Sequence, residues 1–308
     1  TLFFHVSLTI LFISIIAFFQ LIKRAPLGLT IESTSIAPSF GSGADESNLI
    51  FRPVGLAPHA NMMANELLII WLTLLTVYTS LFKNYKFKKI INKFLFITTF
   101  FFLLTIIFSQ SRAVYIAVIT FCSLFFITNY DLAIKIIKFF LLKLKKISII
   151  GFLLLLVIGF IFLQRALNSL NSFNETGGFP IRERLNQEAI DLFEKYPVLG
   201  VGFGMFIPAM AKNNPTGVIS EFPEAVHNGF LLFIVENGLL AQTSIMIFFF
   251  LVIKRISNNK IYLTKKIMLI SFIVQFIPMF FHPFVNYLTV YTIVFLIIMN
   301  QKGTKTIE

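Results

Sequence analysis

Long, nearly uninterrupted runs of apolar residues constrain this chain more than any other feature of its sequence. An α-helix needs about 17 to 25 apolar residues to cross the hydrocarbon core of a bilayer. We predict spanning helices at residues 2–22, 64–82, 94–110, 113–130, 147–163, 229–253, 267–281 and 284–299. Because 57% of the 308 residues are hydrophobic and only 13% are charged, one soluble core could not bury the apolar surface. The prediction is an all-α, polytopic membrane protein with about eight spans.

Charged residues are distributed unequally between alternate connecting segments. Segments 83–93, 131–146 and 254–266 and the C-terminal tail together hold 17 basic and two acidic residues, whereas the rest of the chain holds nine basic and twelve acidic residues. The positive-inside rule places the basic segments in the cytoplasm, and all eight predicted spans then alternate without conflict. Segment 131–146 is also amphipathic and is expected along the inner leaflet. The net charge of +12 therefore reflects the membrane topology, because the basic segments lie beside anionic membrane lipids. No nucleic-acid partner is expected.

Two long segments on the predicted outer side organise the chain into three parts. Residues 1–163 comprise transmembrane helices with an outer loop at 23–63. Residues 164–226 form a second, longer outer loop, and residues 227–308 comprise C-terminal transmembrane helices and a cytoplasmic tail. A long, ordered loop usually has a functional reason. We therefore expect the catalytic residues in the loop 164–226.

Within this loop, residues 181–196 have the pattern of a helix. At 100° per residue, its apolar face comprises Leu185, Ala189, Phe193 and Tyr196. Arg182 falls on that face, whereas Arg184 points to water. An arginine directed towards protein or membrane needs an anionic partner. Arg182 is therefore either a site residue or an arginine that snorkels at the interface or forms a structural ion pair.

Other candidate residues also lie on the predicted outer side. The run from Gly200 to Gly204 could form an anion nest, or only a tight turn before the membrane. His227 and Asn228 stand where the chain re-enters the bilayer; a histidine can exchange protons near neutral pH, or serve only as a polar anchor. Ser111 and Arg112 lie at the end of two adjacent spans, where an ionisable residue is a functional candidate or a cap of the helical hairpin.

These candidates share one chemistry. Arginine binds phosphate oxygens through two parallel hydrogen bonds, and histidine is the usual base near neutral pH. The outer segments show no acidic cluster with the spacing of a divalent-metal site and no set of His and Cys ligands, and Cys122 is a lone cysteine in an apolar stretch. A site with arginines and a base suits transfer from a lipid-linked phosphate donor, and we expect no metal and no cofactor.

In its motifs and their order, the chain resembles the O-antigen ligase and O-antigen polymerase family of bacterial envelope glycosyltransferases. Between about residues 50 and 240, the resemblance is carried by Arg52-Pro-Val-Gly55 with Asn61, by Ser111-Arg112-Ala113, by Arg182 with Pro197-Val-Leu-Gly-Val-Gly202-Phe-Gly204, and by His227-Asn228-Gly-Phe-Leu with Glu236-Asn-Gly-Leu239. Ala113 replaces the glycine usual in the family, and Asn186 stands where the family often has tryptophan. We interpret these departures as those of a diverged member.

The resemblance implies a metal-independent glycosyltransferase in the bacterial inner membrane with its active site on the periplasmic face. The donor would be an undecaprenyl-diphosphate-linked glycan. The acceptor would be lipid A–core for a ligase or a second lipid-linked glycan for a polymerase, and the sequence leaves this choice open. Family members commonly have about a dozen spans, so we expect this chain to lack N-terminal ones.

The same resemblance implies roles for individual residues. Arg112 and Arg182 would hold the diphosphate and offset the charge of the leaving group. His227 would be the base that takes the proton of the acceptor hydroxyl. The residues implied to bind substrate are Ser111, Asn228, Gly200, Gly202, Gly204 and Arg52.

Two other classes of function are alternatives. A transporter or flippase for a lipid-linked or anionic solute predicts charged residues near the middle of spans and an internal repeat. The predicted spans carry almost no such residues, and the two halves show no repeat. A purely structural membrane scaffold would leave Arg182 and His227 replaceable.

Overall fold

The computed structural model describes residues 2–29, 51–81, 88–130, 134, 178–257 and 262–282. Every regular element in these ranges is a helix, which confirms the all-α prediction for this part of the chain. The predicted spans 147–163 and 284–299 lie outside the described residues. So does the amphipathic segment 131–146, apart from Ile134.

Five helical segments in the described ranges are long and apolar enough to cross a membrane. They are α1 (Leu2–Lys23), α2 (Ala60–Leu81), α3 (Lys88–Ser109), α10 (Gly229–Ser257), and α11 (Tyr262–Val274) with the 3-10 helix η2 (Ile277–Phe280) after it. A shorter apolar helix, α4 (Arg112–Thr128), has 17 residues. A helix of 22 residues is about 33 Å long, enough for a hydrocarbon core of about 30 Å. The chain is therefore a multi-pass membrane protein, and the count of about eight spans stays a prediction.

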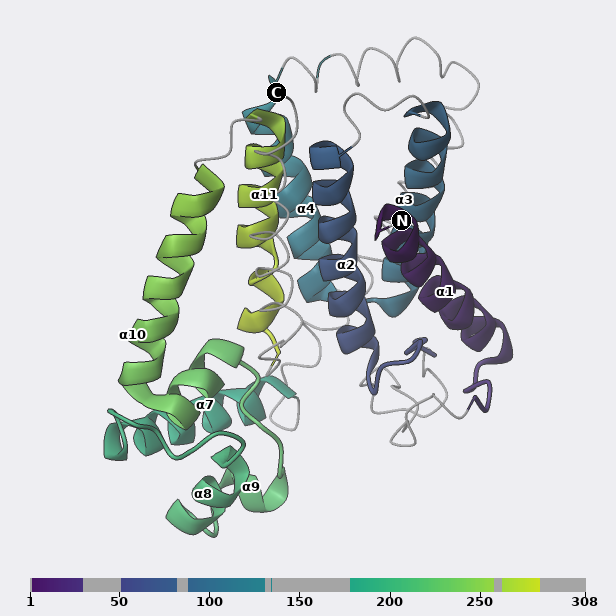
Figure 1. The fold of residues 1–308 in the computed structure, drawn as a ribbon. Helices are drawn as coiled ribbons and strands as arrows, with labels where there is room; N and C mark the ends of the chain where they lie inside the picture. Colours follow the sequence, from purple (N-terminus) through teal and green to yellow (C-terminus); the bar gives the residue numbers. More distant parts are fainter. Residues whose placement is uncertain are drawn as a thin grey trace. The chain divides into compact units, whose positions relative to one another are not determined.

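The chain divides into two compact units, which are described separately. Unit 1 comprises residues 1–121 and 243–308, and unit 2 comprises residues 122–242. In unit 1, α1 packs against α2 and α3, and α2 also packs against α11 (Figure 1). Trp71 of α2 stacks on Phe102 of α3 with 4.7 Å between ring centroids, and Phe121 of α4 meets the indole edge-on at 5.2 Å. Aromatic packing of this kind stabilises helix contacts beyond the burial of area alone.

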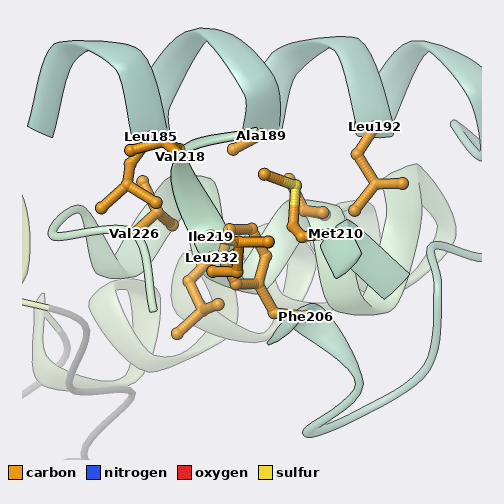
Figure 2. Close-up of a cluster of buried hydrophobic side chains, with 10 residues drawn as sticks. Leu185, Ala189, Leu192, Phe206, Met210, Val218, Ile219, Val226 and Leu232 are labelled. Carbon is orange, nitrogen blue, oxygen red and sulfur yellow. The ribbon is translucent and has the colours of Figure 1, made fainter. Parts of the chain in front are cut away.

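In the described part of unit 2, an apolar cluster lies beneath α7 (Gly178–Lys195). Figure 2 shows side chains of α7 directed towards those of α8 (Phe206–Asn213) and α9 (Val218–Glu221). The buried members are Leu185, Ala189, Leu192, Phe206, Met210, Val218, Ile219, Val226, Leu232 and Val235. Helices as short as α8 and α9 are not stable alone, so this shared core holds them in place. The predicted helix 181–196 is confirmed, with an earlier start at Gly178.

Helix α10 is interrupted at Gly238, which has φ 70° and ψ −179°. Only glycine adopts this backbone conformation without severe strain. The sequence predicts one continuous span at 229–253, so the interruption was not foreseen. It separates a first part of α10, residues 229–237, from an apolar second part that begins at Leu239.

Candidate active site

Two motif segments of unit 2, residues 197–202 and 235–240, pair through their backbones; we call them together the glycine clasp. Four hydrogen bonds of 2.8 to 3.2 Å join them. Each is an N–H donating to a carbonyl oxygen: Val201 to Val235, Gly202 to Glu236, Leu239 to Pro197, and Leu240 to Val198. In an unbroken helix, residues 239 and 240 would donate to the carbonyls of residues 235 and 236. The clasp thus exchanges two helix hydrogen bonds for four between segments, and these buried backbone groups stay paired.

Two glycines allow this close approach. A Cβ at Gly238 would lie 2.2 Å from the carbonyl oxygen of Val198, and a Cβ at Gly200 would lie 2.4 Å from the carbonyl oxygen of Glu236. Both glycines also have left-handed φ values of 70° and 69°. Any side chain at either position would therefore strain the backbone and collide with the opposite segment.

The clasp bears on the two alternatives for the glycine-rich run. The N–H groups of Gly200 and Gly202 donate to the carbonyl oxygens of Tyr196 and Glu236 at 3.0 and 2.8 Å. They are therefore engaged and do not form an anion nest, which favours the tight-turn alternative over substrate binding at these two positions. Gly204 lies beyond the clasp, and a Cβ there would meet no atom within 4 Å.

Glu236 connects the clasp to helix α8. Its side chain is only 7% exposed, and Oε1 accepts a hydrogen bond from the backbone N–H of Phe206 at 3.3 Å. Phe206 is the first residue of α8, and the N-cap residue Met205 makes no side-chain capping bond. A carboxylate at a helix N-terminus is stabilised by unpaired N–H groups and by the helix dipole. The glutamate of the motif therefore builds the frame of the site.

Asn228 starts helix α10. Its Oδ1 accepts hydrogen bonds from the backbone N–H groups of Phe230 and Leu231, both at 3.1 Å. Asparagine is among the best residues for this N-cap position. This capping contact fixes the chain immediately after His227, and it accounts for Asn228 without a bound substrate.

The imidazole of His227 is partly enclosed. Its side chain is 23% exposed, and Nε2 lies 3.8 Å from Oε2 of Glu224. Nδ1 is buried and has no hydrogen-bond partner among the described residues. Nε2 therefore lies near a carboxylate, and the ring is held against the protein on its Nδ1 side.

Arg182 and His227 interact electrostatically within unit 2. Burial of the imidazole and the positive charge of Arg182 lower the pKa of His227, whereas the carboxylate of Glu224 raises it. The net shift is downward, so His227 is neutral at pH 7 and can accept a proton. The structure thus brings together a neutral base, a cation and a carboxylate. Glu224 was not predicted from the sequence, where the only signal is an acidic residue three positions before the histidine.

The position of Arg182 differs from the prediction that it faces the apolar core. The buried stripe of α7 runs along Leu185, Ala189 and Leu192, whereas the side chain of Arg182 is exposed. At 100° per residue, Arg182 lies about 50° from the centre of this stripe. It therefore occupies the edge of the buried face, where its guanidinium reaches solvent.

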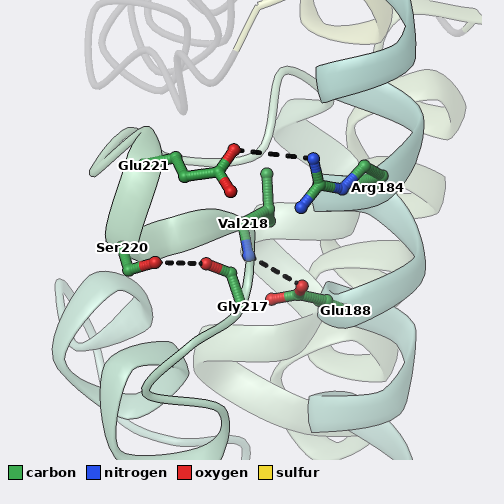
Figure 3. Close-up of polar contacts among 6 residues, drawn as sticks. All are labelled: Arg184, Glu188, Gly217, Val218, Ser220 and Glu221. Atoms are coloured by element: carbon green, nitrogen blue, oxygen red, sulfur yellow. Dashed lines mark hydrogen bonds and ion pairs between the residues drawn. The ribbon is translucent and has the colours of Figure 1, made fainter.

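Two polar contacts join α7 to α9 on the side drawn in Figure 3. Arg184 forms an ion pair with Glu221 at 3.6 Å, and both side chains are about half exposed. Oε1 of Glu188 accepts a hydrogen bond from the N–H of Val218 at 2.9 Å. The prediction that Arg184 points to water holds only in part, because its guanidinium also has an acidic partner.

In unit 1, Arg52 is bound by the protein itself. Its side chain is 7% exposed; Nε donates to the carbonyl oxygen of Ser109 at 2.7 Å, and Nη2 donates to Oδ1 of Asn61 at 2.6 Å. Ser109 is the last residue of α3, where carbonyl groups lack helix partners. These contacts favour a structural role for Arg52 over the predicted substrate-binding role.

The same loop is held by Gln20 of α1, a residue that was not predicted from the sequence. The amide of Gln20 is fully buried; Oε1 accepts from the N–H groups of Val54 and Gly55, and Nε2 donates to the carbonyl oxygen of Gly55. The side chain thereby pairs with the loop as a neighbouring backbone would. A polar residue in an otherwise apolar span was the available signal.

Ser111 and Arg112 stand at the turn between α3 and α4 in unit 1. Ser111 is fully buried, and its Oγ has no hydrogen-bond partner among the residues that the structure describes. Arg112 is the first residue of α4, and its side chain is exposed. The predicted site residues are thus divided: Arg182, His227, Asn228 and the glycines belong to unit 2, whereas Arg52, Ser111 and Arg112 belong to unit 1.

The side chains around the site offer no metal-binding cluster in the part of the chain that the structure describes. Within those ranges, no group of three or more His, Cys, Asp or Glu side chains could hold a metal ion. The charged groups that act on His227 are Arg182 and Glu224. This arrangement can hold an anion and accept a proton.

Comparison with known families supports the resemblance. Residues 97–244 match the family model described as O-antigen ligase. The matched segment contains Ser111, Arg112, Arg182 and His227, and Arg52 lies outside it. No curated protein matches the chain significantly.

Proposed function

We propose, from the O-antigen ligase family domain that this chain carries at residues 97–244, that the protein transfers a glycan from undecaprenyl diphosphate to an acceptor hydroxyl. The family and the multi-pass helices support a membrane glycosyltransferase. The proposed acceptor is lipid A–core, and the proposed site is the periplasmic face of a bacterial inner membrane. The alternative within the family is a polymerase that uses a second lipid-linked glycan as acceptor.

In the proposed reaction, the oxygen of the acceptor hydroxyl attacks the anomeric carbon of the donor glycan. A glycosidic C–O bond forms while the bond between that carbon and the diphosphate oxygen breaks, and undecaprenyl diphosphate leaves with the electron pair. His227 takes the hydroxyl proton. Arg182 binds the diphosphate and offsets its growing negative charge, and the family resemblance assigns the same role to Arg112.

The observation that carries this proposal is the partly enclosed His227 of unit 2, whose Nε2 lies 3.8 Å from Oε2 of Glu224 and whose pKa is lowered by burial and by Arg182. The guanidinium helps to keep the imidazole neutral, so the base is ready before the acceptor binds. The same positive charge suits the diphosphate of the donor. The guanidinium of Arg182 thus acts on both the base and the donor.

We assign the proton-accepting role to Nε2 of His227. Nδ1 is buried, so an acceptor hydroxyl could not reach it, and Nε2 is the nitrogen that faces Glu224. When Nε2 takes the proton, the imidazolium gains a carboxylate 3.8 Å away. Glu224 therefore stabilises the charged form of the base that the reaction generates.

The proposal is tested with three single variants, Arg182→Ala, Arg112→Ala and His227→Ala. Each should lower glycan transfer at least about 100-fold, the usual scale for losing a catalytic base or a charge-stabilising group. Protein level and membrane insertion should stay normal. The matched control is Arg184→Ala, which removes an exposed arginine two positions along the same helix and should keep activity. Full activity in two of the three variants would overturn the assignment.

Deletion of the gene and gel analysis of surface glycans separate the two family activities. A ligase predicts loss of polymer on lipid A–core while lipid-linked polymer accumulates. A polymerase predicts acceptors that carry single repeat units only. Loss of surface glycan together with lipid-linked glycan trapped on the cytoplasmic side would instead indicate a flippase.

The proposed chemistry has no step that uses a metal ion. Transfer by the purified chain should therefore persist in EDTA. A strict requirement for a divalent cation, restored only by adding that cation, would contradict the mechanism.

A further inference from the structure

Exposed apolar side chains gather around the glycine clasp. Val198 is 61% exposed, Leu199 70%, Phe203 63%, Leu239 48% and Leu240 61%. Met205 and Ile207 are also exposed large hydrophobic residues in the segment that follows. A single exposed leucine is ordinary, but a contiguous apolar surface marks a contact with a partner or a membrane.

The hydrogen bonds of the clasp make this surface contiguous. Leu239 donates to the carbonyl oxygen of Pro197, and Leu240 donates to that of Val198. These bonds bring the start of the second part of α10 beside the segment that carries Leu199. Residues about 40 positions apart in sequence therefore lie side by side at the start of the second part of α10.

The length of the second part of α10 bears on the depth of the glycine clasp in the membrane. The uncharged stretch from Leu239 to Ile253 has 15 residues and ends at Lys254 and Arg255. At 1.5 Å per residue it spans about 22 Å, whereas the hydrocarbon core is about 30 Å thick, and tilt shortens the distance covered. A full crossing of the core by this helix therefore requires the apolar layer to extend past Gly238 towards the clasp.

The polarity of the clasp fits this environment. Residues 196–207 contain no charged residue, and Glu236 is buried with its carboxylate bonded to the N–H of Phe206. Non-helical backbone at membrane depth is tolerated where the protein itself satisfies its polar groups. The four hydrogen bonds between the segments satisfy the N–H and carbonyl groups that they join.

We propose that the glycine clasp is embedded in the bilayer, with Val198, Leu199, Leu239 and Leu240 in contact with lipid acyl chains. The leaflet is the one farther from Lys254 and Arg255, which is the outer leaflet under the positive-inside rule. This surface anchors unit 2 at a fixed depth. The inference concerns membrane contact and does not depend on the transfer reaction.

The test uses nitroxide labels on the full-length chain in vesicles of phosphatidylcholine and phosphatidylglycerol. Cys122→Ala removes the single native cysteine, and Leu199→Cys or Leu240→Cys then carries the label. Oxygen concentrates in the bilayer, whereas a water-soluble nickel chelate does not. We expect frequent collisions with oxygen and few with nickel at both positions. Lys212→Cys, an exposed charged position on α8, is the control and should show the reverse.

Two outcomes would overturn the proposal. Nickel collisions as frequent as at residue 212 would place the surface in water. Few collisions with either reagent would mean that protein, such as a second copy of the chain, covers it. As an independent measurement, Leu199→Trp should be quenched by bromine on the acyl chains more strongly than the parent chain, whose only tryptophan is the buried Trp71. Equal quenching would also contradict the proposal.

Discussion

Two arginines that belong to the same set of motifs have opposite surroundings. Arg52 in unit 1 is 7% exposed and donates to Ser109 and Asn61. Arg182 in unit 2 is exposed and acts on the protonation of His227. A motif position therefore does not reveal whether a charged residue serves the fold or the reaction. Burial and the identity of its partners separate the two roles.

The same division runs through the motif residues of unit 2. Gly200, Gly238 and Glu236 build the clasp and hold α8, and Asn228 caps α10. His227, by contrast, has a ring nitrogen, Nδ1, that is buried and lacks a hydrogen-bond partner in the described part of the chain. The frame residues are thus distinguishable from the reactive ones, and the following variants test that distinction.

Gly238→Ala should have the largest effect because it disrupts the glycine clasp directly. The new Cβ would lie 2.2 Å from a backbone oxygen, so we expect a loss of more than about 3 kcal/mol of stability and little folded protein. Gly204→Ala is the matched control, because Gly204 has the same φ of 70° but open space at its Cβ. That change should cost about 1 kcal/mol. Thermal unfolding in detergent compares the two, and similar midpoints would refute the close approach.

Arg52→Ala and Arg182→Ala should separate stability from activity. Removing the buried guanidinium leaves the carbonyl of Ser109 and the amide of Asn61 without a donor, which should cost about 3 kcal/mol. Arg182→Ala removes an exposed group and should change stability by less than about 0.5 kcal/mol. Denaturation curves and transfer assays on both proteins make the comparison. A stable Arg52→Ala protein without activity would instead support the substrate-binding role of Arg52.

Glu224→Gln should alter the pH dependence of transfer. The carboxylate of Glu224 raises the pKa of His227, so its removal lowers that pKa further. The neutral base then persists to lower pH, and the acidic limb of the rate profile should move downward. Glu221→Gln removes an acidic residue that pairs with Arg184 instead, and its profile should match the parent. An acidic limb that moves upward in Glu224→Gln would contradict the effect of this carboxylate on His227.

Arg184→Ala should have the smallest effect. Its ion pair with Glu221 is 3.6 Å long and half exposed, so water and salt screen it. We expect a loss of no more than about 0.5 kcal/mol, which should shrink further at high salt. Unfolding curves at two salt concentrations measure the change. A loss of stability above about 2 kcal/mol would mean that the exposed fraction of a side chain does not predict its contribution to stability in this protein.

Sequence patterns predicted the elements whose formation depends on local residues. The six predicted spans that fall in the described ranges are helices, and so is the predicted segment 181–196. Apolar length and helical period are properties of one segment, so neighbours elsewhere in the chain do not alter them. The motifs likewise marked Arg182 and His227, which the structure brings into one unit. Their catalytic roles stay predictions.

Tertiary structure alone decided what surrounds these residues. The break at Gly238 arises because a segment about 40 residues earlier supplies the hydrogen bonds that the helix gives up. The exposure of Arg182 and the burial of Arg52 depend on which elements cover them, as does the anchoring of the 54–55 loop by Gln20. Helical phase placed Arg182 about 50° from the centre of the buried stripe of α7. It could not show where the elements that cover this stripe end. The sequence by itself determined the membrane helices and the positions of the candidate groups, because these follow from local composition. Their partners and burial were settled by packing, because each depends on contacts between distant segments.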